Sequence, residues 1–168
     1  MQILDEIRDA FANRLLPAQV VRNGAPDTDE YTDAEFFRGK RWDTVSAADW
    51  ESYSAAVFGF SPEAFCYFLP GVFTAGIREN RPDLLVNSSL LMTLDRSNTP
   101  SSWDDFFAKR WPTLHARECR ATQSWLLWLA DVEPAVVDDQ SLGRAFDTID
   151  LLINQAGATP IAAQSPRK

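Results

Sequence analysis

Apolar side chains recur at helical spacing along most of this chain, and this periodicity limits the fold more than any other feature. The first such segment, residues 2–14, places Ile7 and Phe11 on one face and charged residues on the other, as in an amphipathic helix. No segment shows sustained alternation of β-branched residues, and the valine pairs at 20–21 and 136–137 are the best strand candidates. The pattern predicts an all-α bundle of about six to eight helices.

Start and stop signals divide this periodic pattern into separate helices. Ser61, Pro62 and Glu63 combine a serine cap, a first-turn proline and an acid, which is typical of a helix start. Pro70 falls inside the same apolar segment and cannot donate a backbone hydrogen bond, so we expect that helix to be kinked or broken there. A long helix is predicted from residue 113 onward.

The length of 168 residues and the apolar fraction of 45% suit one domain that buries its own core. No internal repeat, low-complexity block or linker interrupts the helical pattern. We therefore expect residues 1–157 to form a single helical domain. Residues 158–168 are small, polar and proline-containing, and we expect them to form a disordered tail.

The chain is acidic, with 24 acidic and 16 basic residues and a formal charge of −8. Such a charge repels nucleic-acid phosphates and anionic lipids, so we expect neither nucleic acid nor membrane as a partner. Two cysteines are too few for a disulfide framework, and the N-terminus lacks a basic region before an apolar run. No segment approaches the ~18 apolar residues that span a bilayer. The sequence therefore predicts a cytoplasmic protein.

Residues that could carry catalysis are few. The only histidine is His115, Cys119 shares its predicted helix face, and Cys66 could add a third metal ligand. The simpler interpretation makes both cysteines small buried residues and His115 a surface or capping residue. Glycine patterns for phosphate binding and for a nucleophile elbow are absent. We therefore expect no catalytic residue, metal site or cofactor.

Acidic residues gather in two segments that we consider binding candidates. The first spans residues 27–35 and contains no basic residue, and the second spans residues 131–150. Solvated helix faces with acids at helix N-termini would explain both, whereas the sharper hypothesis is a docking surface for a basic protein partner. Thr32 and Glu35 also have the spacing of a capping box, which predicts a helix start at Thr32. The candidate acids are Asp27, Asp29, Glu30, Asp33, Glu35, Asp131, Glu133, Asp138 and Asp139.

A basic turn directly follows the first acidic segment. Its binding candidates are Arg38, Lys40 and Trp42, and they surround Gly39, which suits the left-handed position after a helix. The turn could grip a phosphate or a carboxylate, or it could simply pair with nearby acids. Among the six tryptophans, Trp42 and Trp111 each adjoin a basic residue near a predicted helix end, so we expect both at the surface.

Two short motifs stand out from the periodic background. They are Phe-Arg-Gly-Lys-Arg-Trp at residues 37–42 and Ser-Pro-Glu-Ala-Phe-Cys-Tyr-Phe-Leu-Pro at residues 61–70. In these motifs the chain resembles a bacterial family of small proteins of unknown function. The N-terminal helix and the region from Trp103 to Leu129 are similar too, so the resemblance covers residues 1–131. It implies no activity, because the family has none assigned.

These observations favour an interaction protein over an enzyme. Small, acidic, helical proteins without catalytic motifs suit the role of a bacterial immunity protein, whose acidic face would cover the basic active site of a cognate toxin. One alternative is a carboxylate-based hydrolase that uses Glu35, Glu63 or Asp105. Another alternative is an adaptor protein that dimerises through exposed aromatic side chains.

Overall fold

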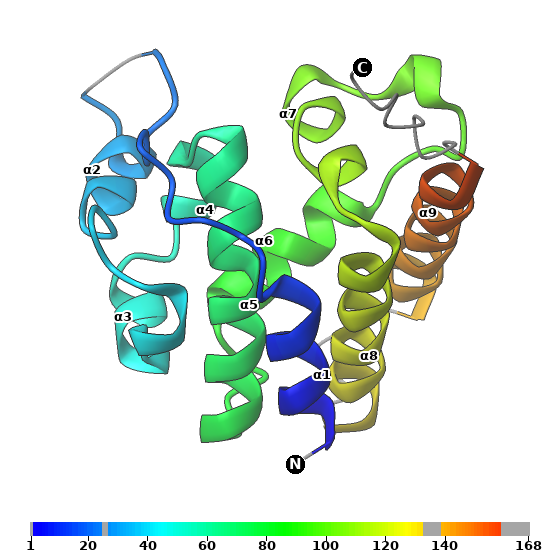
Figure 1. The fold of residues 1–168 in the computed structure, drawn as a ribbon, viewed down its shortest axis with the longest axis horizontal. Coiled ribbons are helices and arrows are strands. Elements are labelled where there is room, and N and C mark those ends of the chain that lie inside the picture. Colours follow the sequence, from blue (N-terminus) through cyan, green and yellow to red (C-terminus); the bar gives the residue numbers. More distant parts are fainter. Residues whose placement is uncertain (1, 25–26, 133–138, 159–168) are drawn as a thin grey trace, which may run out of the picture.

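The structure, a computed structural model, describes residues 2–24, 27–132 and 139–158, which form a bundle of helices (Figure 1). Within these residues no sheet is present, and extended backbone pairs only at an isolated antiparallel bridge between Val21 and Phe60. The all-α prediction is therefore confirmed. In chain order the elements are α1 (Gln2–Phe11), α2 (Asp29–Glu35), η1 (Trp42–Thr44), α3 (Ala47–Ser52), α4 (Ala56–Gly59), α5 (Pro62–Glu79), α6 (Leu85–Leu94), η2 (Pro100–Ser102), α7 (Asp105–Ala108), η3 (Trp111–Thr113), α8 (Ala116–Val132) and α9 (Asp139–Ala158).

The helices are arranged around α5. In Figure 1, α2 and α3 lie on one side of it, and α1, α8 and α9 lie on the other. Four of the α-helices in the described part of the chain, α2, α3, α4 and α7, are only 4 to 7 residues long. The long helices therefore build the frame. Among the short helices, α2 and α4 pack against each other and α3 packs against α5.

The central helix α5 is apolar on every side. Residues 64–76 are all buried, as expected for a helix enclosed by others. Its predicted start is confirmed, because the Ser61 hydroxyl accepts the amide of Ala64 at 3.1 Å and Pro62 occupies the first turn. The helix continues through Pro70, so the chain does not break there. Packing on all sides of this segment outweighs the hydrogen bond that proline removes.

The helix α2 begins one turn earlier than predicted. Thr28 is the N-cap, and its hydroxyl accepts the amide of Tyr31 at 3.4 Å, whereas Thr32 lies inside the helix. The capping-box prediction at Thr32 is therefore wrong, because Thr28 already caps the same helix. Asp29 and Glu30 consequently occupy the first turn, where the helix dipole favours negative charge.

Contact between α2 and α4 is so close that it requires glycine. A methyl group on Gly59 would lie 1.9 Å from the carbonyl oxygen of Glu30. The carboxylate of Asp33 also accepts the amide of Ala55, at the start of α4, at 3.0 Å. These contacts fix α2 against the bundle and determine where its acidic residues face.

Aromatic side chains fill the core between α5 and the C-terminal helices. Phe73 of α5 stacks on Trp125 of α8, with ring centroids 4.5 Å apart. Trp111 is also completely buried, and its indole nitrogen donates to the Thr93 hydroxyl at 3.0 Å. The prediction that Trp111 lies at the surface is therefore wrong, because an internal hydroxyl satisfies its single polar atom.

The last helix, α9, closes the bundle against α6 and α8. Ala145, Ile149 and Leu152 of this helix are buried, and Leu142, Phe146 and Ile153 are partly buried against the same core. The valine pair at 136–137 and residues 159–168 of the predicted tail lie outside the described residues.

Candidate functional site

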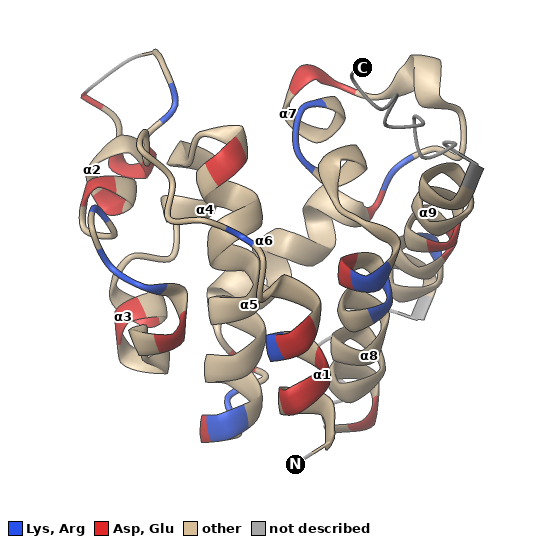
Figure 2. Ribbon diagram, in the orientation of Figure 1, with Lys and Arg blue, Asp and Glu red and all other residues tan. Residues whose placement is uncertain are grey.

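The first predicted acidic segment lies at the edge of the bundle and comprises α2 and the two residues before it (Figure 2). Asp27 and Asp29 are exposed, and in the described chain no ion pair involves either of them or Glu30. Hydrogen bonds from its own amide and from Thr28 lower the pKa of Glu30. These three carboxylates are therefore available to a partner, and we call them the α2 acidic surface.

The other two acids of this segment serve the fold. Asp33 is partly buried against the start of α4, and burial raises its pKa, although its hydrogen bond to the Ala55 amide opposes the shift. Glu35 accepts two hydrogen bonds from Arg38, at 2.7 and 2.6 Å. A carboxylate that is bound by another element of the fold or by a guanidinium offers less to a partner. Asp33 and Glu35 are consequently weaker binding candidates than the α2 acidic surface.

Neighbouring acids pair with the two arginines of the predicted basic turn, and an aromatic ring faces its lysine. The carboxylate of Glu35 accepts from the guanidinium of Arg38. The guanidinium of Arg41 donates to the carboxylate of Asp43 at 3.0 and 2.6 Å. The ammonium nitrogen of Lys40 lies 4.0 Å from the ring centroid of Phe36, which is close enough for a cation–π contact. The interpretation that this turn pairs with nearby acids fits the structure better than a grip on a free anion.

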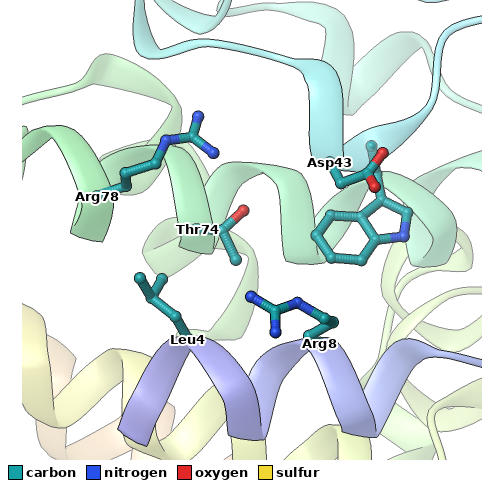
Figure 3. Close-up of a pocket in the computed structure, with 6 residues that line it drawn as sticks. Leu4, Arg8, Asp43, Thr74 and Arg78 are labelled. Atoms are coloured by element: carbon teal, nitrogen blue, oxygen red, sulfur yellow. The ribbon is translucent and has the colours of Figure 1, made fainter. Parts of the chain in front are cut away.

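The half-buried Trp42 lines a shallow cavity of about 240 Å³ between α1, η1 and α5 (Figure 3). The guanidinium groups of Arg8 and Arg78 extend into this cavity from opposite sides of Thr74. Each also contacts an acid on its own helix, at 2.9 and 3.3 Å. The cations facing Trp42 are therefore already partly balanced.

The second predicted acidic segment is only partly described. Asp131 is exposed near the end of α8, and Asp139 is the first residue of α9. Glu133 and Asp138 lie outside the described residues. A docking role for this segment stays a prediction.

The residues considered for a metal site do not converge. Cys66 and Cys119 are buried, whereas His115 is exposed. The thiol of Cys66 lies 3.2 Å from the hydroxyl of Thr113. Across the part of the chain that the structure describes, no group of three histidine, cysteine, aspartate or glutamate side chains is placed to hold a metal ion. Both cysteines instead act as small core residues.

A cavity of about 500 Å³ between α1 and α8 contains one acid considered for hydrolysis, Glu63. His115 and Glu118 also line this cavity, but the Glu118 carboxylate is fully engaged. It accepts two 2.6 Å hydrogen bonds from Arg14 and one 2.7 Å hydrogen bond from the backbone amide of His115. The other two acids considered for hydrolysis lie on α2 and α7. The three hydrolase candidates therefore do not share a site.

Sequence reasoning missed a buried arginine next to α7. Arg110 is only 4% exposed, and its guanidinium carbon lies 4.1 Å from the ring centroid of Phe106. The available signal was the spacing of these two residues. Phe106 precedes Arg110 by about one helical turn, a spacing that could have indicated a contact between the aromatic ring and the cation.

In comparisons with known proteins, no family model, curated protein or solved structure matches this chain. The resemblance suggested by the motifs at 37–42 and 61–70 therefore stays a prediction. In the structure the second motif forms the cap and first half of α5, and the first forms the turn after α2. None of the described helices is both long and apolar enough to cross a lipid bilayer.

Proposed function

We propose that this protein acts by binding a basic protein partner through the α2 acidic surface. The observation that carries the proposal is that Asp27, Asp29 and Glu30 stand together at the start of α2 and form no ion pair in the described chain. Many other surface acids are already paired with an arginine or a lysine. Unpaired acidic side chains attract a basic protein and speed its association.

The helix that carries Asp29 and Glu30 of the α2 acidic surface is held against α4. The close approach of Gly59 to Glu30 and the hydrogen bond from Ala55 to Asp33 hold α2 on α4. A surface whose charges are already in position loses little conformational entropy when it binds. The geometry therefore favours recognition by a fixed surface.

Within this class we propose an immunity protein that neutralises a cognate toxin. A toxin that acts on nucleic acid needs a basic active site, because it must bind phosphates. An acidic surface can cover such a site, and the formal charge of −8 supports attraction over a distance.

The alternative of an adaptor that dimerises through exposed aromatics stays a prediction. The aromatic side chains nearest the surface of the described chain, among them Trp42, Trp103 and Trp128, are half-buried and pack against the core. The exposed large apolar side chains are aliphatic, and they include Leu15, Leu85 and Met92.

Two charge-matched variants test the proposal. The α2 variant combines Asp27→Asn, Asp29→Asn and Glu30→Gln. The control variant combines Asp9→Asn, Asp147→Asn and Glu63→Gln, which removes the same charge from exposed acids that also form no ion pair in the described chain. Each variant and the wild type are co-expressed in turn with the product of each gene beside this one, and growth is measured.

The wild type and the control variant are expected to protect the cells, whereas the α2 variant is not. With the purified toxin, the association rate of the α2 variant should fall on the order of tenfold at low salt. Equal protection by the α2 variant would overturn the proposed surface. Failure of the wild type to protect against any neighbouring gene product would overturn the immunity function.

A further inference from the structure

Arg110 carries a buried positive charge that no carboxylate of the described chain pairs with. Its two terminal nitrogens, Nη1 and Nη2, donate to the carbonyl oxygens of Phe106 and Phe60 at 3.1 and 2.7 Å. Its Nε atom is buried and has no hydrogen-bond partner among the described residues. A guanidinium has five N–H groups, and burying an unpaired charge is costly. Two carbonyls therefore satisfy Arg110 only in part.

A second arginine, Arg22, is brought to the same place by the isolated bridge. The amide of Arg22 donates to the carbonyl of Gly59 at 2.8 Å, next to the pairing of Val21 with Phe60. The carbonyl of Phe60 also binds Arg110, so one stretch of backbone anchors both arginines. Burial is the main cause that lowers the pKa of Arg110, and the charge of Arg22 is the next.

Both arginines line one cavity of about 450 Å³, which we call the arginine cavity. Lys109 and Asp105 also line it, and they pair with each other at 2.7 Å. Pro62 contributes the first turn of α5, where the helix dipole places partial positive charge. The lining thus holds three cations and one anion, in a chain whose formal charge is −8.

Three acids outside this lining act on the arginines without neutralising them. The charges of Asp104 and Glu63 oppose the lowering of the pKa of Arg110. The charge of Arg22, in turn, contributes to the lowered pKa of Glu30. Asp104 is itself paired with another arginine at 3.0 Å. In the described chain no ion pair joins Glu63 or Glu30 to either arginine. No carboxylate of the described chain therefore neutralises either guanidinium through an ion pair.

We propose that the arginine cavity binds the phosphate group of a small molecule between Arg22 and Arg110. A phosphate dianion matches the surplus of positive charge in the lining, and the planar guanidinium presents paired donors to phosphate oxygens. The N-terminal end of α5 adds favourable dipole charge. The ring of Phe106 offers an apolar wall to the rest of the ligand, and the volume is typical of small-molecule sites.

Titration with inorganic phosphate at constant ionic strength tests this site. Backbone amide signals of the isotope-labelled full chain are followed for the wild type, Arg22→Gln and Arg120→Gln. Arg22 is exposed, so its replacement leaves the core intact. Arg120 is a matched control, because it is an exposed arginine of α8 outside the lining of the arginine cavity. Acetate replaces phosphate in a parallel titration to separate a carboxylate site from a phosphate site.

Phosphate is expected to give saturable shifts at residues 22, 109 and 110, with a Kd of about 1 mM. Arg22→Gln should weaken this binding at least about tenfold, a loss of ~1.4 kcal/mol, and Arg120→Gln should not change it. The proposal is overturned if phosphate does not saturate, if Arg22→Gln binds like the wild type, or if acetate binds as tightly as phosphate. If Arg110 only holds the two backbone carbonyls, phosphate is expected not to saturate. The charge of Arg22 also acts on Glu30 of the α2 acidic surface, but the phosphate titration needs no protein partner, so either proposal can fail without the other.

Discussion

Asp95 joins α6 to α9 through its ion pair with Arg144, in which Nη2 lies 2.7 Å from Oδ2. The hydrogen bond from Arg144 is the main cause that lowers the pKa of Asp95 from its ordinary value of 3.8. Because the folded-state pKa is below the unfolded one, the stabilisation is complete above the ordinary pKa. It is lost as the pH falls through the folded-state pKa.

We therefore expect Asp95→Asn to lower the free energy of unfolding by about 1 kcal/mol at neutral pH, a value reduced by solvent screening because both side chains are partly exposed. Urea unfolding at neutral pH and well below pH 3.8 measures the difference between variant and wild type. In acid the difference should disappear. A difference that persists in acid would show that packing of the side chain, rather than its charge, supports the contact.

The two buried thiols give a second prediction at the scale of single residues. Burial raises the pKa of Cys119 to about 12 and also raises that of Cys66. Since the thiolate is the reactive form, an aromatic disulfide reagent should label neither cysteine in the native protein. Both should be labelled in denaturant, which serves as the control. Rapid native labelling would contradict the burial of the thiols and indicate that the core opens to solvent.

At the scale of elements, the contact between α2 and α4 depends on the absence of a side chain at Gly59. We expect Gly59→Ala to destabilise the protein by about 1–3 kcal/mol, because the new methyl group would overlap the Glu30 carbonyl and push α2 away. Gly143→Ala is the matched control, since Gly143 lies in α9 with nothing near its missing methyl group. The control should stabilise the protein by roughly 0.5–1 kcal/mol.

Chemical denaturation of both glycine variants distinguishes the two effects. If Gly59→Ala were neutral, α2 would have to be free to shift on α4. The α2 acidic surface would then lack the rigid support that the proposed function assumes.

Helix ends were predictable where the signal is local. The Ser61 and Pro62 start of α5 is correct, because capping involves only neighbouring residues. The long helix expected from residue 113 begins instead at Ala116, because residues 111–113 form the 3-10 helix η3. Burial of Trp111 at the start of η3 draws that turn into the core, and the local sequence does not reveal this packing.

At the scale of the whole molecule, α9 should unfold together with the rest of the bundle. Ile149 of α9 is completely buried, and we expect Ile149→Ala to lower the free energy of unfolding by about 2–5 kcal/mol. Leu127→Ala is the control, because Leu127 is 59% exposed. Far-UV circular dichroism reports all helices, whereas tryptophan fluorescence reports only residues outside α9. Equal shifts of both midpoints are expected for one cooperative unit.

Different midpoints for the two probes would show that α9 unfolds separately. The division into one domain over residues 1–157, which the sequence predicts, would then need revision. Coincident midpoints would support it for the described part of that range.

For much of the candidate site, the sequence predicts which residues are acidic but not which contacts they make. The sequence shows that residues 27–35 are acidic, but it does not show that Asp33 binds the amide of Ala55 or that Glu35 binds Arg38. The first of these contacts joins separate helices, and the second depends on the turn that follows α2. Such pairing engages some carboxylates of the segment and leaves others available. The binding surface is therefore smaller than the acidic segment seen in the sequence.

The sequence by itself determined that this chain is helical, where its clearest helix begins, and that its surface is acidic, because spacing, capping and composition act over short distances. Only the tertiary structure decided which acids stay unpaired, that Trp111 is buried, and that Arg22 meets Arg110. Those outcomes depend on contacts between distant segments. The bridge between residues 21 and 60 is the plainest case, since it places two like charges in one cavity of an acidic protein.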